Sequence, residues 1–275
     1  MTNIVWLQSQ LQINLKSHAG LIRYLSPLTT SPTIKSYSMP SVSHRLDRFI
    51  SRRLSIANKA VRELLVRKKI IVDGQVASLM NQTVGPFTSV VVDGEVIQQR
   101  QPVYLMMNKP KGVVSATKDD KHTTVLDLID HPLKHELHIA GRLDFNTTGL
   151  LLLTNDGAWS KQLSLPENNI VKKYRVTLKN QLSSNDVLIY QKKFSEGVFL
   201  LPEKITTRPA TLLALSSNIV ELSICEGRYH QVKRMFGFFQ NEVRELHRLS
   251  VGSLEMEEGL MLGQCRALAP RDIQI

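Results

Sequence analysis

Asp144 is the side chain in this sequence best suited to covalent or acid–base chemistry. It lies in "GRLDFNTTGLLLLTNDG" (141–157), two residues after Arg142 and shortly before an apolar run that predicts a buried strand. A carboxylate beside such a strand can act as a nucleophile or as a general base. It can equally cap a turn by accepting from the amides of Asn146 and Thr147, and the segment alone leaves both interpretations open.

A second segment supplies cations that can face a carboxylate or an anionic substrate. "EGRYHQVKRMF" (226–236) predicts a helix that follows a glycine turn, and its spacing lets Arg228, His230 and Lys233 project into one pocket. A single histidine is more often a structural hydrogen-bonding residue than a general base. The function of this segment therefore depends on what it faces.

Two strand-like segments add an aromatic ring and a basic turn. "KKYRV" (172–176) places Tyr174 either as a surface on which a planar base can stack or as an ordinary half-buried sheet aromatic. "NKPKG" (108–112) follows an apolar strand and predicts a tight turn. We expect this turn to expose Lys109 and Lys111 to an anionic partner, although a solvated lysine pair is equally ordinary.

The elements that must position these groups predict an α+β fold. After a short linker at Arg100 to Pro102, short strand patterns outnumber helical ones, which favours a mixed or antiparallel sheet with flanking helices over 101–275. The expected strands include "TVLDLI" (124–129) and "SLEMEEGLMLGQCRAL" (253–268). The expected helices are "GAWSKQLSL" (157–165), "SSNDVLIYQKKFSEG" (183–197) and "RYHQVKRMFGFFQ" (228–240).

A compact basic unit precedes this region, over residues 40–100. Apolar spacing predicts two short helices, and "IIVDGQVA" predicts a hairpin around an Asp-Gly turn. The net charge of the chain is +11, which favours an anionic partner, either nucleic acid or acidic lipid. The helices lack the exposed large apolar residues of a membrane-surface helix, so we expect RNA phosphates as the partner. The expected RNA-contacting residues of this unit are Arg45, Arg48, Arg52, Arg53, Lys59 and Arg62.

Residues 1–39 contain no Asp or Glu and many Ser and Thr, a composition that resembles an organellar transit peptide. The alternatives are a disordered N-terminal extension and a start site at Met39. We favour these alternatives, since nothing else in the chain points to an organelle.

Several classes of function are excluded by missing motifs. Cys225 and Cys265 form no CxxC pair and have no histidine at ligand spacing, so we expect reduced packing residues in a cytoplasmic protein and no metal site. No apolar run reaches the ~18 residues of a membrane helix. The glycine-rich phosphate-binding motifs are also missing, and we expect no nucleotide cofactor.

Two resemblances to known families rest on these motifs. "RLDRFISRRLSIANKAVRELLVRKKIIVDGQVA" resembles the S4 family of RNA-binding domains, which implies an S4-like domain over 40–100. "GRLD" followed by "TTGLLLLTNDG", then "KKYRV" and "EGRYHQVKRMF", resembles the pseudouridine synthases of the small-subunit ribosomal RNA branch. This second resemblance runs from about residue 44 to "GQCRAL" near the end of the chain.

The pseudouridine synthase resemblance implies a role for each of four residues. Asp144 matches the nucleophilic carboxylate of the family, and Tyr174 matches the aromatic residue that packs on the target base. Lys233 matches the basic residue paired with the carboxylate, and Arg142 matches the arginine that helps to displace the target base. Arg228 and His230 are expected to contact the RNA. Phe145 and Asn146 depart from the charged pair that is common in the family.

The implied reaction isomerises uridine to pseudouridine without a cofactor, because no atoms are lost and no redox change occurs. The implied substrate is uridine 516 of 16S ribosomal RNA, either free or in a small-subunit assembly intermediate, and we expect a monomer. Two alternatives stay open: a uridine of 23S ribosomal RNA, and a catalytically silent RNA-binding assembly factor. A pure binding protein would not need Asp144, Tyr174 and Lys233 together.

Overall fold

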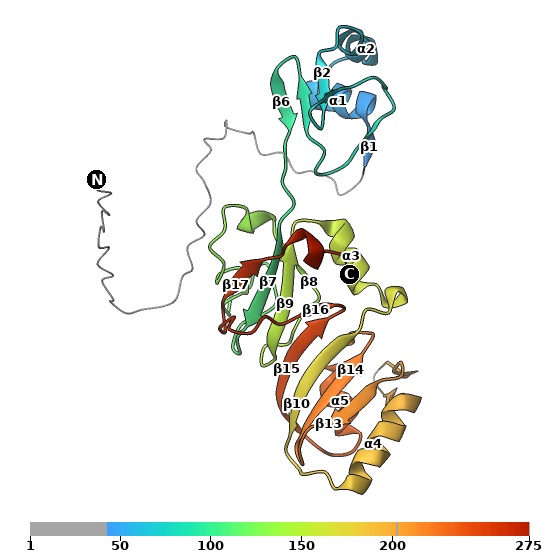
Figure 1. The fold of residues 1–275 in the computed structure, drawn as a ribbon, viewed down its shortest axis with the longest axis vertical. Coiled ribbons are helices and arrows are strands. Elements are labelled where there is room, and N and C mark those ends of the chain that lie inside the picture. Colours follow the sequence, from blue (N-terminus) through green and yellow to red (C-terminus); the bar gives the residue numbers. More distant parts are fainter. Residues whose placement is uncertain (1–42, 202, 275) are drawn as a thin grey trace, which may run out of the picture.

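The computed structural model describes residues 43–201 and 203–274, so the expectations for residues 1–39 lie outside the described residues. The described chain forms two units, each with its own hydrophobic core (Figure 1). We refer to residues 43–98 as the amino-terminal unit and to residues 103–274 as the carboxyl-terminal unit. Arg100, in the connecting segment, forms an ion pair with Glu136 at 2.7 Å.

The amino-terminal unit packs two helices on a small antiparallel sheet. Its elements are β1 (His44–Arg45), α1 (Leu46–Leu54), α2 (Asn58–Val66), β2 (Ile70–Val72), β3 (Gln75–Val76), β4 (Thr83–Val84), β5 (Val90–Val92) and β6 (Glu95–Gln98). The sheet order is β3-β2-β5-β6, and β1 pairs with β4. Both expected helices and the Asp-Gly hairpin are present. Asp73 and Gly74 both adopt positive φ values, as the tight turn between β2 and β3 requires.

The carboxyl-terminal unit is built on one long mixed sheet. Its elements are β7 (Tyr104–Lys109), β8 (His138–Ala140), β9 (Thr148–Thr154), α3 (Gly157–Ser164), β10 (Lys172–Leu178), α4 (Ser184–Glu196), β11 (Phe199–Leu200), β12 (Ile205–Thr206), β13 (Thr211–Ala214), β14 (Ile219–Ile224), α5 (Gln231–Gly237), β15 (Val243–Val251), β16 (Leu254–Glu255) and β17 (Cys265–Ala267). The main sheet order is β13-β14-β10-β15-β9-β7-β17. The β15–β9 pair is parallel and the other pairs along this order are antiparallel, which confirms the α+β fold class.

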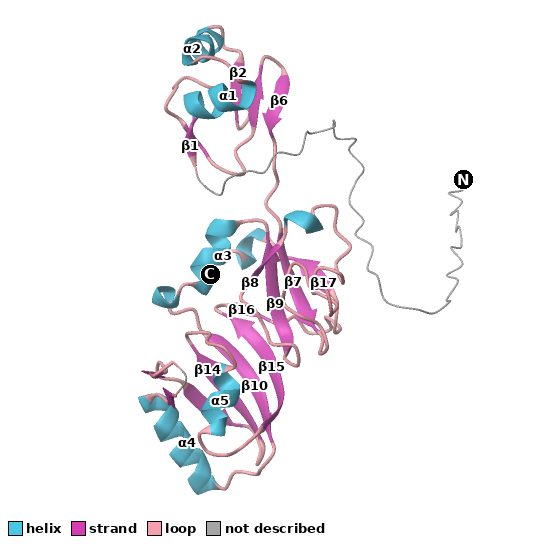
Figure 2. Ribbon diagram, turned by 180° about the vertical axis from the view of Figure 1, so that it is seen from behind, coloured by secondary structure: helices cyan, strands magenta, loops and turns pink. Residues whose placement is uncertain are grey.

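The four consecutive leucines of β9 are explained by the two cores that the strand contacts. Leu151 and Leu153 belong to the large core of the unit, whereas Leu150 and Leu152 belong to a second core on the other face of the sheet. Side chains alternate between the two faces of a strand, so a strand buried on both faces reads as a continuous apolar run. Helices α4 and α5 cover one face of the β10–β14 part of the sheet (Figure 2).

Three expectations about local structure are wrong. Residues 124–129 form turns rather than a strand, because the Asp127 carboxylate accepts from both the amide and the hydroxyl of Thr124. The expected strand over 253–268 is reduced to β16 and β17, with turns between them. Helix α5 begins at Gln231 rather than at Arg228, because His230 has a left-handed backbone conformation with φ 49°.

Candidate active site

The loop between β8 and β9, residues 141–147, carries Asp144 and is held by side chains from three other segments. The Ser115 hydroxyl accepts from the Leu143 amide at 3.1 Å and donates to the Leu143 carbonyl at 2.7 Å. The Arg248 guanidinium donates to the Gly141 carbonyl at 2.9 Å. These bonds fix the backbone of the loop, which is required for a reacting group to be preorganised.

Lys109 also holds this loop, and the expectation that its side chain is exposed is wrong. Its side chain is fully buried, and Nζ donates to the carbonyls of Pro110, Asp144, Phe145 and Thr147 at 3.0–3.3 Å. Burial lowers the pKa of Lys109 to about 8, although the charge of Asp144 opposes that shift. The strand β7 extends to Lys109, so its side chain points into the fold rather than out from a turn.

The Asp144 carboxylate faces the start of α5. Its Oδ2 lies 3.6 Å from Lys233 Nζ and 3.6 Å from His230 Nε2. The backbone carbonyl of Asp144 accepts from the Thr147 amide, so the turn is closed by main-chain atoms while the carboxylate is free for another role. The 28% exposed side chain of Asp144 is accessible from a pocket. Lys233 Nζ and His230 Nε2 therefore both face the same carboxylate oxygen.

Tyr174 lies on the sheet beneath this carboxylate. It is buried at 7% exposure on β10, opposite Leu222 of β14 and Arg248 of β15. Arg248 is 1% exposed and also donates from Nε to the Leu150 carbonyl at 2.7 Å. The Tyr174 ring and the Arg248 guanidinium therefore form part of the floor of the pocket that Asp144 lines.

One cavity of about 810 Å³ is lined by three of the four predicted catalytic residues. Such a volume lies within the ~300–1,000 Å³ typical of small-molecule sites. The predicted residues that line it are Arg142, Asp144, Tyr174, Arg228 and His230. Arg142 is exposed at its mouth, and Arg228 is paired with the buried carboxylate of Glu226 at 3.1 Å. His230 stacks on the exposed ring of Tyr229 with the ring centroids 3.9 Å apart.

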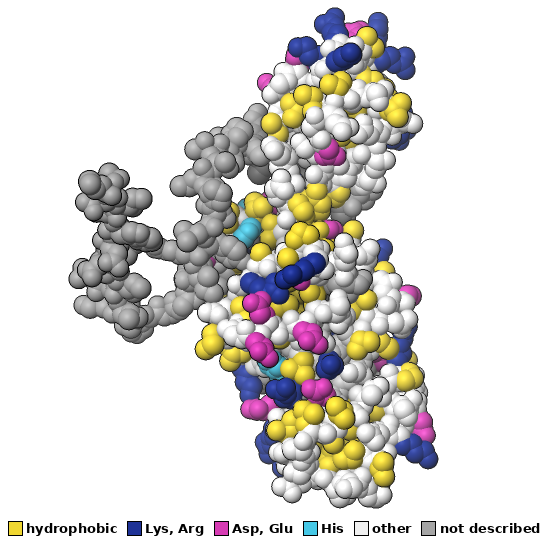
Figure 3. Space-filling model, viewed as in Figure 1, with side chains coloured by type: hydrophobic (Ala, Val, Ile, Leu, Met, Phe, Trp, Pro, Cys, Tyr) yellow, Lys and Arg dark blue, Asp and Glu magenta, His cyan; other side chains and the backbone are white. Residues whose placement is uncertain are grey.

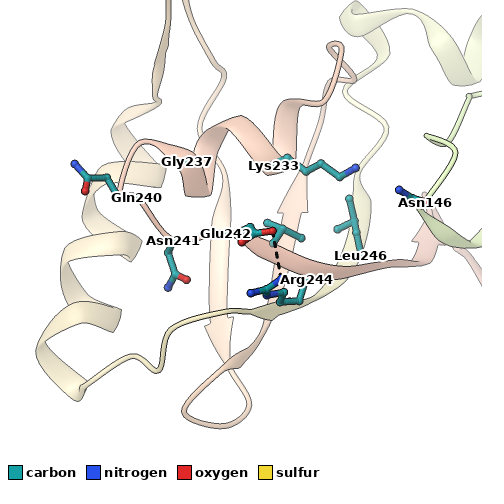
Figure 4. A pocket seen from close by; sticks show the side chains of 9 residues that line it. Asn146, Lys233, Gly237, Gln240, Asn241, Glu242, Arg244 and Leu246 are labelled. Atoms are coloured by element: carbon teal, nitrogen blue, oxygen red, sulfur yellow. Dashed lines mark ion pairs between the residues drawn. The ribbon is translucent and has the colours of Figure 1, made fainter.

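Lys233 lines a second hollow of about 580 Å³ (Figure 4). Figure 4 shows the Lys233 side chain extending toward Asn146, with Leu246 below its end. Leu246 lines both hollows. Asn146, one of the two positions that depart from the common family pattern, therefore lies at the edge of the site. The other, Phe145, packs edge-on against His122 at 5.3 Å.

The remaining predicted RNA-contacting residues lie away from the pocket. Lys and Arg side chains gather over α2 at the end of the amino-terminal unit (Figure 3). The exposed members of the predicted set in this unit are Arg45, Arg48, Arg52, Lys59 and Arg62, and Arg53 is half-buried. Arg45 is already paired with Asp47 at 2.7 Å. Lys111 is exposed in the carboxyl-terminal unit and lies 3.7 Å from Glu245.

Arg248 and the inward orientation of Lys109 were not identified from the sequence. For Arg248 a signal exists: Leu246, Arg248 and Ser250 are buried at alternate positions of β15, so period-two patterning places this arginine in the core. For Lys109 the alternating pattern did not decide the orientation, because Pro110 and Gly112 follow it and predict a turn. Among the described residues, no group of three His, Cys, Asp or Glu side chains is arranged to hold a metal ion. None of the helices within the described ranges is long and apolar enough to cross a bilayer.

Comparisons with known proteins identify relatives of this chain. The family model described as RNA pseudouridylate synthase matches residues 103–237. The chain is 41% identical over 230 residues to ribosomal small subunit pseudouridine synthase A of Yersinia pestis, covering 83% of this chain and 96% of that protein. The protein of the same name from Escherichia coli (strain K12) is 39% identical, with 83% of this chain and 98% of that protein covered.

A comparison with solved structures points to the same family. A crystal structure of a pseudouridylate synthase superposes with a TM-score of 0.60 at 35% identity, over 84% of this chain and 98% of that chain. Sequence identity at this level, over nearly the whole length of these relatives, confirms the resemblance carried by the "GRLD", "KKYRV" and "GRYHQVKRMF" motifs. The chain belongs to the RNA pseudouridylate synthase family.

Proposed function

We propose that this protein isomerises a uridine of small-subunit ribosomal RNA to pseudouridine, with Asp144 as the reacting residue. The observation that carries the proposal is the position of the Asp144 carboxylate: it lies 3.6 Å from Lys233 Nζ, in the cavity whose floor includes Tyr174. The small-subunit substrate is supported by the names of the relatives, which are ribosomal small subunit pseudouridine synthases.

The reaction balances without any co-reactant. The bond between uracil N1 and ribose C1′ breaks, the uracil rotates, and a bond forms between C5 and C1′; C5 loses a proton and N1 gains one. Asp144 acts on the ribose, either by attack on C1′ or by accepting a sugar proton, and both roles require its ionised form. Lys233 Nζ, 3.6 Å from Asp144 Oδ2, supplies the positive charge that pairs with the carboxylate.

The uridine must leave its stack to reach this cavity, which costs a few kcal/mol. Stacking on Tyr174 returns ~1–3 kcal/mol of that cost. Arg142 is exposed at the mouth of the cavity, where its side chain can occupy the space that the uridine vacates. Asp144 is thereby presented with an extruded nucleotide held on an aromatic surface.

We further propose that residues 40–100, which include the amino-terminal unit, form an S4-like RNA-binding domain that selects the RNA structure. The support is the group of exposed cations Arg48, Arg52, Lys59 and Arg62, which are not paired with a carboxylate within the described chain. Phosphate contacts position a protein on RNA without reading sequence, so the choice of base falls to the carboxyl-terminal unit. The proposed target is uridine 516 of 16S ribosomal RNA, and the proposed form of the enzyme is a monomer.

The proposal is tested by tritium release from ribosomal RNA labelled at uridine C5. Wild type should release tritium from 16S RNA, and Asp144→Asn and Asp144→Ala should not, while both variants keep the melting temperature and RNA affinity of wild type. A 23S transcript and assembled small subunits serve as parallel substrates, and mapping the modified nucleotide identifies the target. Release from 23S RNA alone would contradict the small-subunit assignment, and wild type that binds RNA but releases nothing would indicate a silent assembly factor.

A further inference from the structure

The cavity beside Asp144 contains more positive charge than its carboxylates balance. Lys233 and His230 face Asp144, and Arg228 is paired with Glu226. Among the described residues, Lys172 and Arg248 also line the cavity, and neither lies within 4.0 Å of a carboxylate oxygen.

These two cations are neighbours of Tyr174 on the sheet. Lys172 and Tyr174 are two residues apart on β10 and both line the cavity, whereas Lys173 between them does not. Arg248 is directly opposite Tyr174 on the neighbouring strand β15. A nucleotide that stacks on Tyr174 therefore lies near both cationic groups.

Both cations are partly or wholly removed from water, which is costly without an anion. Arg248 is 1% exposed; its Nε and Nη2 donate to carbonyls, and Nη1 has no hydrogen-bond partner within the described chain. Lys172 is half-buried, and its Nζ donates only to the Ile170 carbonyl at 3.3 Å. Burial lowers the pKa of Lys172, and the nearby charge of Arg248 lowers it further.

We propose that Lys172 Nζ and Arg248 Nη1 bind a phosphate group of the RNA that adjoins the target uridine. A phosphate supplies the anionic oxygens that these two donors lack, and a charge-assisted bond to each would hold the sugar in place above the cavity. The inference rests on the proposed function, because the uridine on Tyr174 is what brings the phosphate to this position. Arg142 also lines the cavity but is exposed, so it lacks the burial that makes an anion necessary for Lys172 and Arg248.

The test uses three probes that need no knowledge of the RNA: uridine, uridine 5′-monophosphate and uridine 3′-monophosphate. Their dissociation constants are measured by NMR titration of wild type, Lys172→Met, Lys172→Arg and Lys173→Met. Lys173 is the matched control, because it precedes Tyr174 on the same strand but does not line the cavity.

Wild type should bind one of the two monophosphates at least about tenfold more tightly than uridine, as a charge-assisted hydrogen bond of ~1.5–3 kcal/mol requires. The monophosphate that gains affinity identifies the phosphate on the 5′ or the 3′ side. Lys172→Met should abolish the preference while its affinity for uridine is unchanged. Lys172→Arg and Lys173→Met should both retain the preference.

Equal affinity of wild type for all three probes would overturn the proposal. So would a Lys172→Met variant that loses uridine and monophosphate affinity in the same proportion, because that result indicates a structural role. If Lys173→Met lost as much of the monophosphate preference as Lys172→Met, the preference would arise from the overall positive charge of the strand. That result would also overturn the proposal. Wild type that is active in tritium release but lacks the phosphate preference refutes this inference alone, whereas an inactive wild type with the preference refutes the proposed function alone.

Discussion

Lys109 Nζ donates a hydrogen bond to the main-chain carbonyl of Asp144 at 3.1 Å. The carboxylate of the same residue instead faces Lys233, 3.6 Å away. One lysine therefore holds the backbone of the 141–147 loop, and the other faces the carboxylate that the loop presents. The two lysines can be tested separately, because a backbone anchor and a carboxylate partner affect stability and turnover differently.

Replacement of Lys233 should slow the chemical step more than it weakens RNA binding. We expect Lys233→Met to lower the single-turnover rate by about 10²–10³-fold, as loss of one preorganised electrostatic partner commonly does, with RNA affinity changed by less than tenfold. Lys233→Arg should recover part of the rate because it keeps the charge beside Asp144. Lys161→Met is the matched control, because Lys161 is an exposed lysine on α3. A similar rate loss in this variant would mean that the rate depends on the net charge of the protein and not on the charge beside Asp144.

Replacement of Tyr174 should separate stacking from hydrogen bonding. The phenol oxygen makes no hydrogen bond within the described chain, and the ring lines the cavity. Tyr174→Phe should therefore bind substrate RNA within a few-fold of wild type. Tyr174→Leu should lose ~1–3 kcal/mol of binding, or roughly 5–150-fold in Kd measured by filter binding. Equal losses in both variants would assign the contribution to the hydroxyl instead of the ring.

Gly149→Ala should destabilise the carboxyl-terminal unit, because β9 approaches β15 closely at this residue. Gly149 has φ +104°, and a Cβ there would lie 2.3 Å from the backbone oxygen of Arg248. We expect a loss of at least about 2 kcal/mol, which lowers Tm by several degrees in a differential scanning calorimetry experiment. Gly227→Ala is the control, since its φ is ordinary and a Cβ would meet nothing within 4 Å. A Tm shift no larger than that of the control would contradict the close approach.

Lys109 should make stability rise with pH in the alkaline range. Its folded pKa of about 8 lies below the ordinary lysine value of 10.5, so between these values the unfolded chain binds the proton and the folded chain does not. Raising the pH across this window therefore favours the folded state, by at most ~3 kcal/mol, and that stability is lost as the pH falls through about 8.

The measurement for Lys109 is urea unfolding at several pH values for wild type and Lys109→Met. The difference between the two proteins isolates Lys109 from the other groups that titrate in this range. A difference that stays constant from pH 7 to pH 10.5 would mean that burial does not perturb this lysine.

The amino-terminal unit should contribute a salt-dependent part of RNA affinity. The triple variant Arg52→Ala, Lys59→Ala and Arg62→Ala should reduce the slope of log K against log salt by about 2–3, since each lost phosphate contact removes ~0.7–0.9. Arg45→Ala is the control, because Asp47 already neutralises that arginine at 2.7 Å. An unchanged slope in the triple variant, measured by filter binding on 16S RNA, would remove these residues from the RNA contact surface.

The sequence by itself determined the elements whose patterns are local. The two amino-terminal helices, the Asp-Gly hairpin and the buried strand Leu150 to Leu153 follow from apolar spacing and turn chemistry. The order of the "GRLD", "KKYRV" and "GRYHQVKRMF" motifs determined the family. Residues 124–129 were misread as a strand because a short apolar run does not show that the Asp127 side chain closes a turn.

Only the tertiary structure decided which charged side chains face one another. Asp144 and Lys233 are far apart in the chain, and the parallel pairing of β9 with β15 is what brings the loop and α5 together. The structure also showed that Lys109 and Arg248 point inward, since a charged residue in a sequence reads as a surface residue. Their partners are backbone carbonyls, which every residue carries, so no sequence pattern marks which carbonyls a buried cation will hold.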